Sequence, residues 1–281
     1  MPGHLALVTD STAYLPQDAV DRHRIEVVPL SVAVGDEVLD EGVEISPKDV
    51  AEALRAKQRV TTSRPSPETF AAAYRAAAEA GATAVVSVHL SAELSGTYEA
   101  AKMAAADAPV PVEVVDSRLV GMALGHCVLT AAQAAEAGLG AAEVAAAAVR
   151  RSELTSGFFY VDTLEHLRRG GRIGTARALL GSALAVKPLL HLSGGRIEPL
   201  EKVRTASRAI ARLEEIAVEH AGETEVDVVV HHLAAEERAE PLAERLRARI
   251  PNLRDLSVGE VGAVIGAHVG PGLLAVVVAP R

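Results

Sequence analysis

Four short loops carry hydroxyl side chains of a kind that could hold an anion. They contain Asp10-Ser11-Thr12, Thr61-Thr62-Ser63-Arg64, Ser91 to Thr97, and Asp116-Ser117. Three of the loops follow predicted strands, and ligands of open parallel sheets bind outside the carboxyl ends of the strands. Each hydroxyl taken alone is typical of a helix cap. Four such loops at one edge of one sheet favour a binding cleft.

Three basic segments could complete a clamp for a carboxylate or a phosphate. Arg168-Arg169-Gly170-Gly171-Arg172 places guanidinium groups around a Gly-Gly turn, Arg204 follows a predicted strand, and His268 begins His268-Val269-Gly270-Pro271-Gly272. Guanidinium forks match planar oxyanions, and glycines let backbone approach a ligand closely. We expect Arg168 and Arg169 to be solvated charges at a helix end, which leaves Arg172 as the stronger candidate for a site.

Several chemistries lack the residues that they need. The sequence contains no G-x-x-x-x-G-K-[ST] loop, no G-x-G-x-x-G after the first strand and no G-x-S-x-G elbow. It has no H-E-x-x-H motif, and His231-His232 are adjacent rather than helically spaced, so no zinc site is expected. Cys127, in an apolar helical run, is predicted to be a small buried hydrophobe rather than a nucleophile. The sequence thus offers side chains that can bind an anion, but no evident set of nucleophile and base for catalysis.

Strand and helix signals alternate through the first half of the chain. Leu5 to Val8, Ala84 to Val88 and Val112 to Val115 are short apolar runs, and each precedes a helical stretch. Ser46-Pro47 and Ser66-Pro67 are N-cap and first-turn signals that predict helix starts. This alternation predicts βαβ units and a mostly parallel sheet.

The second half has a different pattern. Leu184 to Leu192 and Ile197 to Val203 flank Ser193-Gly194-Gly195-Arg196, which predicts a β-hairpin. Further predicted elements are helices at about Ala206 to His220 and Ala235 to Arg249 and strands at Val226 to Val230 and Leu273 to Val278. Hairpin strands beside two helices suggest a two-layer mixed sheet. The predicted domains are residues 1–153 and 154–281, divided within Arg151 to Thr155.

Composition narrows the class of protein. The 281 residues carry a formal net charge of −9, which argues against a nucleic-acid partner, since such proteins present a basic face. A single Cys and the lack of a signal-like start predict a cytoplasmic protein. Arg, Glu or Gly interrupts every apolar run before it reaches the roughly 20 residues of a membrane span.

The ordered set of motifs resembles the DegV family of bacterial fatty-acid-binding proteins along nearly the whole chain. The resemblance is carried by Val8 to Thr12, Thr61 to Ser66, Leu94 to Tyr98, Val115 to Ser117, Leu167 to Ile173, Lys187-Pro188, Lys202 to Thr205 and His268 to Gly272. This sequence departs from the family pattern at Arg64, where Gln is usual, and at His231-His232, where His-Ala is often found.

The resemblance implies an α/β fold of two domains. The first is a three-layer α/β/α domain with a parallel sheet, the second is a smaller two-layer α/β domain with a mixed sheet, and one long-chain, palmitate-like fatty acid lies between them. By the same resemblance the ligand carboxylate is held by a set of five side chains: Thr62, Ser95, Arg172, Arg204 and His268.

The resemblance also implies a role in phospholipid metabolism without catalysis by this chain. The protein would present the carboxylate of its fatty acid to a separate fatty acid kinase, which makes the acyl phosphate, with transient contact to a membrane surface during lipid exchange. Such a presenter needs neither a metal nor a cofactor. Two other hypotheses stay open: a phosphoryl-transfer or hydrolytic enzyme that uses the same Ser/Thr/Arg/His cluster, and a regulatory module whose bound lipid is a signal.

Overall fold

The computed structural model describes residues 4–179 and 187–281, and the chain passes repeatedly between two units. The first unit consists of residues 1–31 and 63–154, and the second consists of 32–62 and 155–281. The expected division fell at 153/154, next to the break after residue 154. The structure differs from the expected contiguous domains because 32–62 groups with the second unit, which is therefore the larger of the two.

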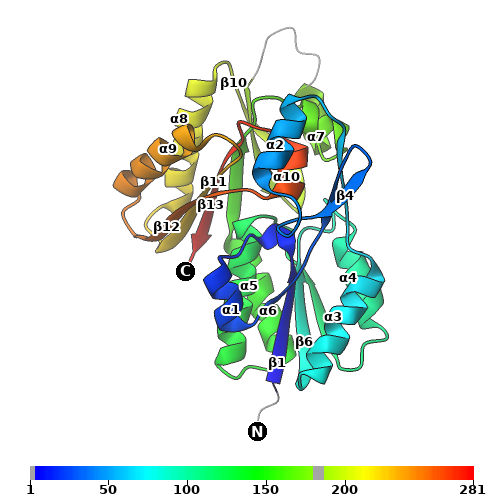
Figure 1. The fold of residues 1–281 in the computed structure, drawn as a ribbon. Helices are drawn as coiled ribbons and strands as arrows, with labels where there is room; N and C mark the ends of the chain where they lie inside the picture. Colours follow the sequence, from blue (N-terminus) through cyan, green and yellow to red (C-terminus); the bar gives the residue numbers. More distant parts are fainter. Residues whose placement is uncertain (1–3, 180–186) are drawn as a thin grey trace. The chain divides into compact units, whose positions relative to one another are not determined.

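The first unit is built on a parallel sheet with strand order β2-β1-β6-β7, as predicted. Its strands are β1 (His4–Asp10), β2 (Glu26–Val28), β6 (Ala82–His89) and β7 (Val112–Asp116). Its helices are η1 (Ser11–Ala13), α1 (Gln17–His23), α3 (Pro67–Glu79), α4 (Thr97–Ala105), α5 (Met122–Glu136) and α6 (Ala141–Leu154). Helices α3 and α4 lie on one side of this sheet and α5 and α6 on the other, which makes three layers (Figure 1).

Two helices begin at the predicted Ser-Pro signals. The side chain of Ser66 accepts a hydrogen bond from the backbone N–H of Thr69 at the start of α3. At the start of α2 (Pro47–Arg55), Ser46 and Asp49 form a capping box, in which each side chain bonds the other's backbone N–H. Proline at the first helical position needs no N–H there, so both starts are favoured locally.

The second unit is built on a mixed sheet with strand order β10-β9-β8-β13-β11-β12. Its strands are β8 (Ser156–Tyr160), β9 (Lys187–Ser193), β10 (Arg196–Val203), β11 (Val226–His232), β12 (Leu253–Glu260) and β13 (Leu274–Pro280). Strands β11 and β12 are parallel, and the other neighbours are antiparallel. The predicted hairpin is confirmed by the pairing of Arg196 with Ser193; the part of its first strand before Lys187 lies outside the described residues.

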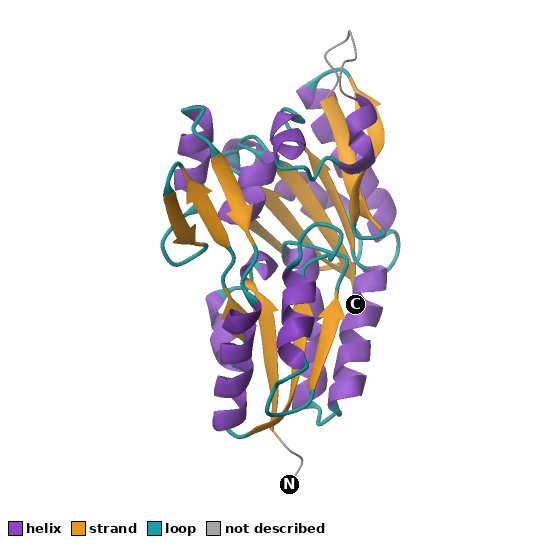
Figure 2. Cartoon of the chain, turned by 90° about the vertical axis from the view of Figure 1, so that its right-hand side faces the viewer, coloured by secondary structure: helices purple, strands orange, loops and turns teal. Residues whose placement is uncertain are grey.

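The helices of this unit are α7 (Glu165–Arg169), η2 (Gly174–Leu179), α8 (Ala206–Ala221), α9 (Glu236–Arg249) and α10 (Ala263–Val269). Residues 32–62 supply most of β3 (Ser31–Val34) and β5 (Val60–Ser63), together with β4 (Glu37–Asp40) and α2. The order β4-β3-β5 forms a separate three-stranded sheet. Both units contain helices as well as strands (Figure 2), which is the α/β class that the sequence predicts.

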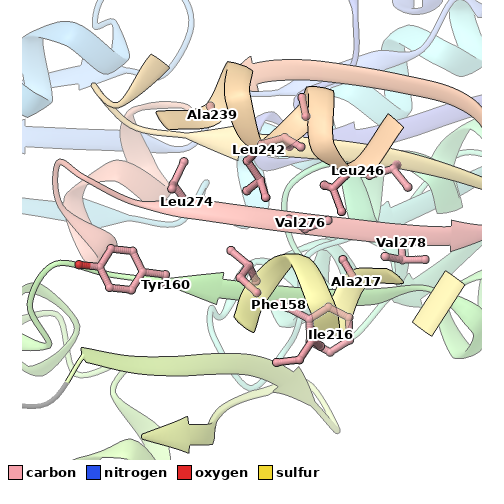
Figure 3. Close-up of a cluster of buried hydrophobic side chains, with 14 of the residues drawn as sticks. Phe158, Tyr160, Ile216, Ala217, Ala239, Leu242, Leu246, Leu274, Val276 and Val278 are labelled. Carbon is pink, nitrogen blue, oxygen red and sulfur yellow. The ribbon is translucent and has the colours of Figure 1, made fainter. Parts of the chain in front are cut away.

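The core of the second unit lies between the mixed sheet and helices α8 and α9. Alternate residues of β13, namely Leu274, Val276 and Val278, are buried and point to one face of the sheet (Figure 3). Leu242 and Leu246 of α9 pack against them, one helical turn apart. The period of two in the strand and four in the helix gives each element one apolar face, so their burial holds the layer together.

Cys127 is fully buried in α5, where its Sγ lies 3.3 Å from the carbonyl oxygen of Ala123. Burial raises the pKa of this thiol to about 12, which keeps it protonated and unreactive. Its environment is that of the small hydrophobe predicted. In the described part of the chain, no helix is both long and apolar enough to span a bilayer.

Candidate functional site

Two predicted site residues, Thr62 and His268, meet in the second unit although 206 positions separate them. Oγ1 of Thr62, on β5, lies 2.8 Å from Nε2 of His268, near the end of α10. The contact joins the segment 32–62 to the last helix of the chain. It pairs a hydroxyl with an imidazole, which together can offer hydrogen to an anion.

His268 is held in its neutral form. Burial, together with the positive charge of Arg172, lowers the pKa of His268 to about 4. Its Nδ1 atom is buried and has no hydrogen-bond partner among the described residues. With the proton on Nε2, the imidazole donates to Thr62 Oγ1, and the hydroxyl hydrogen of Thr62 remains able to donate to a ligand.

Arg172 lies beside this pair in a tight turn that follows α7. The backbone N–H of Arg172 donates to the carbonyl oxygen of Leu167 at 3.0 Å, and its Nη1 donates to the carbonyl oxygen of Gly170 at 2.7 Å. These bonds hold the half-buried guanidinium close enough to His268 to affect its pKa. A fixed positive charge beside a neutral donor pair is suited to an anion.

Two glycines allow α7 and α10 to approach each other closely. A Cβ atom on Gly170 would clash with Nδ1 of His268, and a Cβ atom on Gly270 would clash with the ring of His166. Gly270 also has a φ of +75°, which L side chains rarely adopt. Gly170 and Gly270 thus let backbone pack directly against imidazoles, whereas the sequence predicts that Gly270 lets backbone approach a ligand.

Arg168 and Arg169 are exposed at the end of α7, and both pair with Glu165. Nη2 of Arg168 lies 2.6 Å and Nε of Arg169 lies 2.8 Å from Oε1 of Glu165. These pairs lower the pKa of Glu165 to about 2. Their geometry is that of helix-end charges, as expected.

Asp162, which lies just after β8, accepts two hydrogen bonds and was not singled out from the sequence. Tyr160 donates its hydroxyl to Oδ1 of Asp162 at 2.5 Å, and Nζ of Lys187 donates to the carbonyl oxygen of Asp162 at 2.9 Å. The only signal that could have pointed here is the Lys187-Pro188 motif, whose lysine thereby connects β9 to the end of β8.

Arg204 is exposed between β10 and α8, just before Thr205, the N-cap of α8. Within the described residues, no hydrogen bond or ion pair joins Arg204 to Thr62, Arg172 or His268. Its place in the same anion site stays a prediction.

Ser95 belongs to the first unit, where it lies in the loop before α4. Its Oγ lies 2.9 Å from Oγ1 of Thr97, and its N–H donates to the carbonyl oxygen of Ser91. Arg64, the residue that departs from the family pattern, covers this loop: its Nη1 donates to the carbonyl oxygen of Gly96 at 3.1 Å. The membership of Ser95 in one carboxylate site with Thr62 also stays a prediction.

The loop Asp10-Ser11-Thr12 is part of a buried network rather than a free anion site. Asp10 accepts hydrogen bonds from Thr12 N–H and Oγ1 and from Leu90 N–H, and lies 3.0 Å from Nδ1 of His89. Nε2 of His89 lies 2.7 Å from Oγ of Ser87. Here the short helix η1 is capped by the carboxylate of Asp10 and not by a hydroxyl, and the network fixes the start of the loop that carries Ser95.

The adjacent histidines are also accounted for by packing. Both His231 and His232 are buried at the end of β11. Nδ1 of His231 lies 3.2 Å from the carbonyl oxygen of Gly259, and Nδ1 of His232 lies 3.7 Å from Oε1 of Glu260. Within residues 4–179 and 187–281, no group of three or more His, Cys, Asp or Glu side chains could hold a metal ion.

Three kinds of similarity agree with this architecture. Residues 4–281 match the family model described as "Uncharacterised protein, DegV family". The chain is 64% identical over 281 residues to a DegV domain-containing protein of Streptomyces coelicolor, with full coverage of both chains. It is 37% identical to Protein DegV of Bacillus subtilis, covering 97% of this chain and 98% of that protein.

Solved structures are similar over the same length. One is a DegV family protein from Thermus thermophilus, described by its fatty acid binding, with a TM-score of 0.93, 35% identity and coverage of 99% and 100% of the two chains. Another is DegV of Bacillus subtilis, described as a fatty acid binding protein, with a TM-score of 0.91, 34% identity and the same coverage.

The fold and the match together define an α/β protein of two units, one with a parallel sheet and one with a mixed sheet. The chain belongs to the DegV family.

Proposed function

We propose that this protein binds one long-chain fatty acid and holds its carboxylate with Thr62, Ser95, Arg172, Arg204 and His268. The observation that carries the proposal is the pair of Thr62 and His268, kept neutral beside the charge of Arg172. The relatives from Thermus thermophilus and Bacillus subtilis, described as binding fatty acids, support it.

The chemistry of the pair fits a carboxylate. A carboxylate taken out of water needs several donors, because an unpaired buried charge costs several kcal/mol. Thr62 supplies a hydroxyl hydrogen while it accepts from the imidazole, and Arg172 supplies positive charge that persists at any working pH. An acyl tail of roughly 14 methylenes, at about 0.8 kcal/mol each, gives about 11 kcal/mol before the costs of binding, which favours affinity tighter than micromolar.

The proposal includes presentation of the carboxylate to a separate fatty acid kinase, with the protein acting in the bacterial cytoplasm and touching a membrane surface only during lipid exchange. The sequence has no P-loop for ATP, and a presenter needs none. A kinase that adds a phosphoryl group to the carboxylate builds negative charge there. Fixed guanidinium groups stabilise that charge more than they stabilise the bound acid.

Mass spectrometry of an organic extract tests the binding step. We expect protein purified from a bacterial host to retain about one free fatty acid per chain. Thr62→Ala and Ser95→Ala should each weaken binding of the acid by roughly 1–3 kcal/mol. Thr62→Ser, which keeps the hydroxyl, serves as the control, and methyl esters should bind worse than acids. Absence of lipid in the extract, with no binding of added palmitate or oleate, would refute the proposal.

Presentation is tested with Arg172→Ala and a cognate kinase. We expect acyl-phosphate formation to fall far more than lipid retention. Arg168→Ala removes an arginine of the same segment that pairs with exposed Glu165 and should change neither. If a folded Arg172→Ala protein supports acyl-phosphate formation at the wild-type rate, the proposed role of Arg172 in presentation is refuted. Formation of acyl phosphate or ADP by the loaded protein alone, with ATP and Mg²⁺, would instead favour an enzyme.

A further inference from the structure

Helix α10, which carries His268, has no N-cap side chain of its own. Its N-cap residue is Gly262, which makes no side-chain hydrogen bond. The backbone N–H of Val264, in the first turn, donates instead to Oε1 of Glu41 at 2.8 Å. The two residues are 223 positions apart, so a carboxylate from the segment 32–62 performs a role that is usually local.

Glu41 is placed to perform this role firmly. Only 4% of its surface is exposed, although an ionised carboxylate is rarely buried without partners. The first turn of a helix offers free N–H groups and partial positive charge, both of which stabilise a carboxylate. The hydrogen bond from Val264 N–H thus stabilises the buried carboxylate of Glu41, and the same bond fixes the first turn of α10.

Two further contacts join α10 to the same segment along its length. A Cβ atom on Gly266 would lie 3.6 Å from Cγ1 of Val50, which shows that α2 packs closely against the middle of α10. Near the end of α10, His268 bonds Thr62. The segment 32–62 therefore holds the helix at its first turn, its middle and its last turn.

We propose that Glu41 is a positioning residue for the anion site. By holding the first turn of α10, Glu41 places His268 where it meets Thr62. This inference rests on the proposed function, because it deepens the account of the same site. Glu41 acts through the helix and does not itself bind the ligand.

The short length of α10 allows a shift at its first turn to reach His268. At 1.5 Å per residue the seven residues span about 10 Å, so a small slide or rotation at the first turn is carried to His268. Hydrogen bonds weaken steeply beyond about 3.2 Å, and the bond between Thr62 and His268 is 2.8 Å long. Loss of the cap should therefore loosen that bond and expose the imidazole.

The test compares Glu41→Ala with Glu41→Gln in the full chain, by NMR titration of His268 in lipid-free protein and by affinity for palmitate and methyl palmitate. We expect Glu41→Ala to raise the pKa of His268 by more than one unit from about 4. We expect it to weaken palmitate binding about tenfold while methyl palmitate changes less than twofold. Glu41→Gln keeps an oxygen acceptor and should stay within about threefold of wild type for palmitate.

Ser46→Ala is the matched control, since it removes a helix cap in the same segment and leaves Glu41, Val50 and Thr62 in place. It should lower the melting temperature and leave the pKa of His268 unchanged. A folded Glu41→Ala protein with a wild-type pKa of His268 would overturn the inference. If Glu41→Ala does not fold, Glu41→Asp, which withdraws the carboxylate, should give an intermediate shift, and no shift would count equally against the inference.

The two proposals fail separately. If wild-type protein binds no fatty acid, the proposed function fails, and the pKa of His268 still reports whether Glu41 positions α10. If wild type binds and Glu41→Ala alters neither the pKa nor the acid-to-ester ratio, only the positioning role is lost.

Discussion

At the scale of single residues, the site depends on a histidine that stays neutral. His268 lies next to Arg172, and burial together with this charge lowers its pKa to about 4. Protonation would place two cations side by side away from water. A neutral imidazole instead orders the hydroxyl of Thr62 beside the positive charge of Arg172.

This depressed pKa predicts a loss of stability in mild acid. An unfolded His268 takes a proton near pH 6.5, whereas the folded one takes it near pH 4. Its contribution to folding is therefore complete above about pH 6.5 and is lost as the pH falls toward 4, by up to about 3 kcal/mol. We expect His268→Gln to remove this part of the acid sensitivity, measured by urea unfolding at pH 7, 5.5 and 4.5. Parallel pH profiles of wild type and His268→Gln would contradict the prediction.

The buried carboxylate of Asp10 should be among the most sensitive residues of the first unit. Asp10→Ala leaves Nδ1 of His89 and the N–H of Leu90 without their buried partner, so we expect a loss of about 3 kcal/mol or more in the free energy of unfolding. Asp18→Ala, which breaks an exposed pair with Arg22, should cost less than about 1 kcal/mol. Chemical denaturation of both variants makes the comparison. Similar losses would show that the network is not a fixed part of the fold.

At the scale of elements, α7 and α10 fit together through a glycine and a histidine from each. Gly170 of the turn after α7 faces His268 of α10, and Gly270 after α10 faces His166 of α7. Each imidazole fills the space that a side chain on the opposite glycine would take. The separation of the two helices is therefore set by contacts with backbone.

Gly170→Ala is expected to displace the imidazole of His268 and to weaken palmitate binding about tenfold or more. The backbone of Gly170 has a negative φ, so the effect would come from the clash and not from backbone strain. Gly259→Ala is the control, because a Cβ atom there meets nothing within 4 Å and should be tolerated. Calorimetric titration of palmitate into both variants measures the effect. Wild-type affinity in Gly170→Ala would show that the helices can separate without consequence.

At the scale of the whole molecule, the chain completes its second unit with a segment taken from near its beginning. Residues 32–62 contribute Glu41, Val50 and Thr62 to contacts with α10, whereas the rest of that unit begins at residue 155. The second unit is thus continuous in space and discontinuous in sequence.

We expect residues 155–281 alone to be less stable than the same residues joined by a flexible linker to 32–62. The difference should exceed about 2 kcal/mol, from loss of one helix cap at about 1 kcal/mol and of the buried Val50 contact at roughly 1.5–3 kcal/mol. Urea unfolding of the two proteins, followed by circular dichroism, gives the comparison. Equal midpoints would mean that the segment does not stabilise this unit.

The sequence alone determined the local elements and the family. The Ser-Pro caps, the Gly-Gly hairpin and the alternation of apolar runs with helices are signals within a few residues, and the structure confirms them. The sequence does not predict strand β12, because Leu253 to Glu260 has few apolar residues, as suits a strand at the edge of the described sheet, next to β11. The ordered motifs were specific enough to identify the DegV family.

Only the tertiary structure decided which of the candidate residues meet. Thr62 and His268 are 206 positions apart, Glu41 and Val264 are 223 apart, and no local pattern links them. Asp10 and Thr62 both belong to hydroxyl-bearing loops that the sequence singles out, yet Asp10 lies in a buried network of the first unit. Helix and strand signals act over two to four residues, whereas these contacts depend on which apolar faces pack together, and the sequence does not show that pairing.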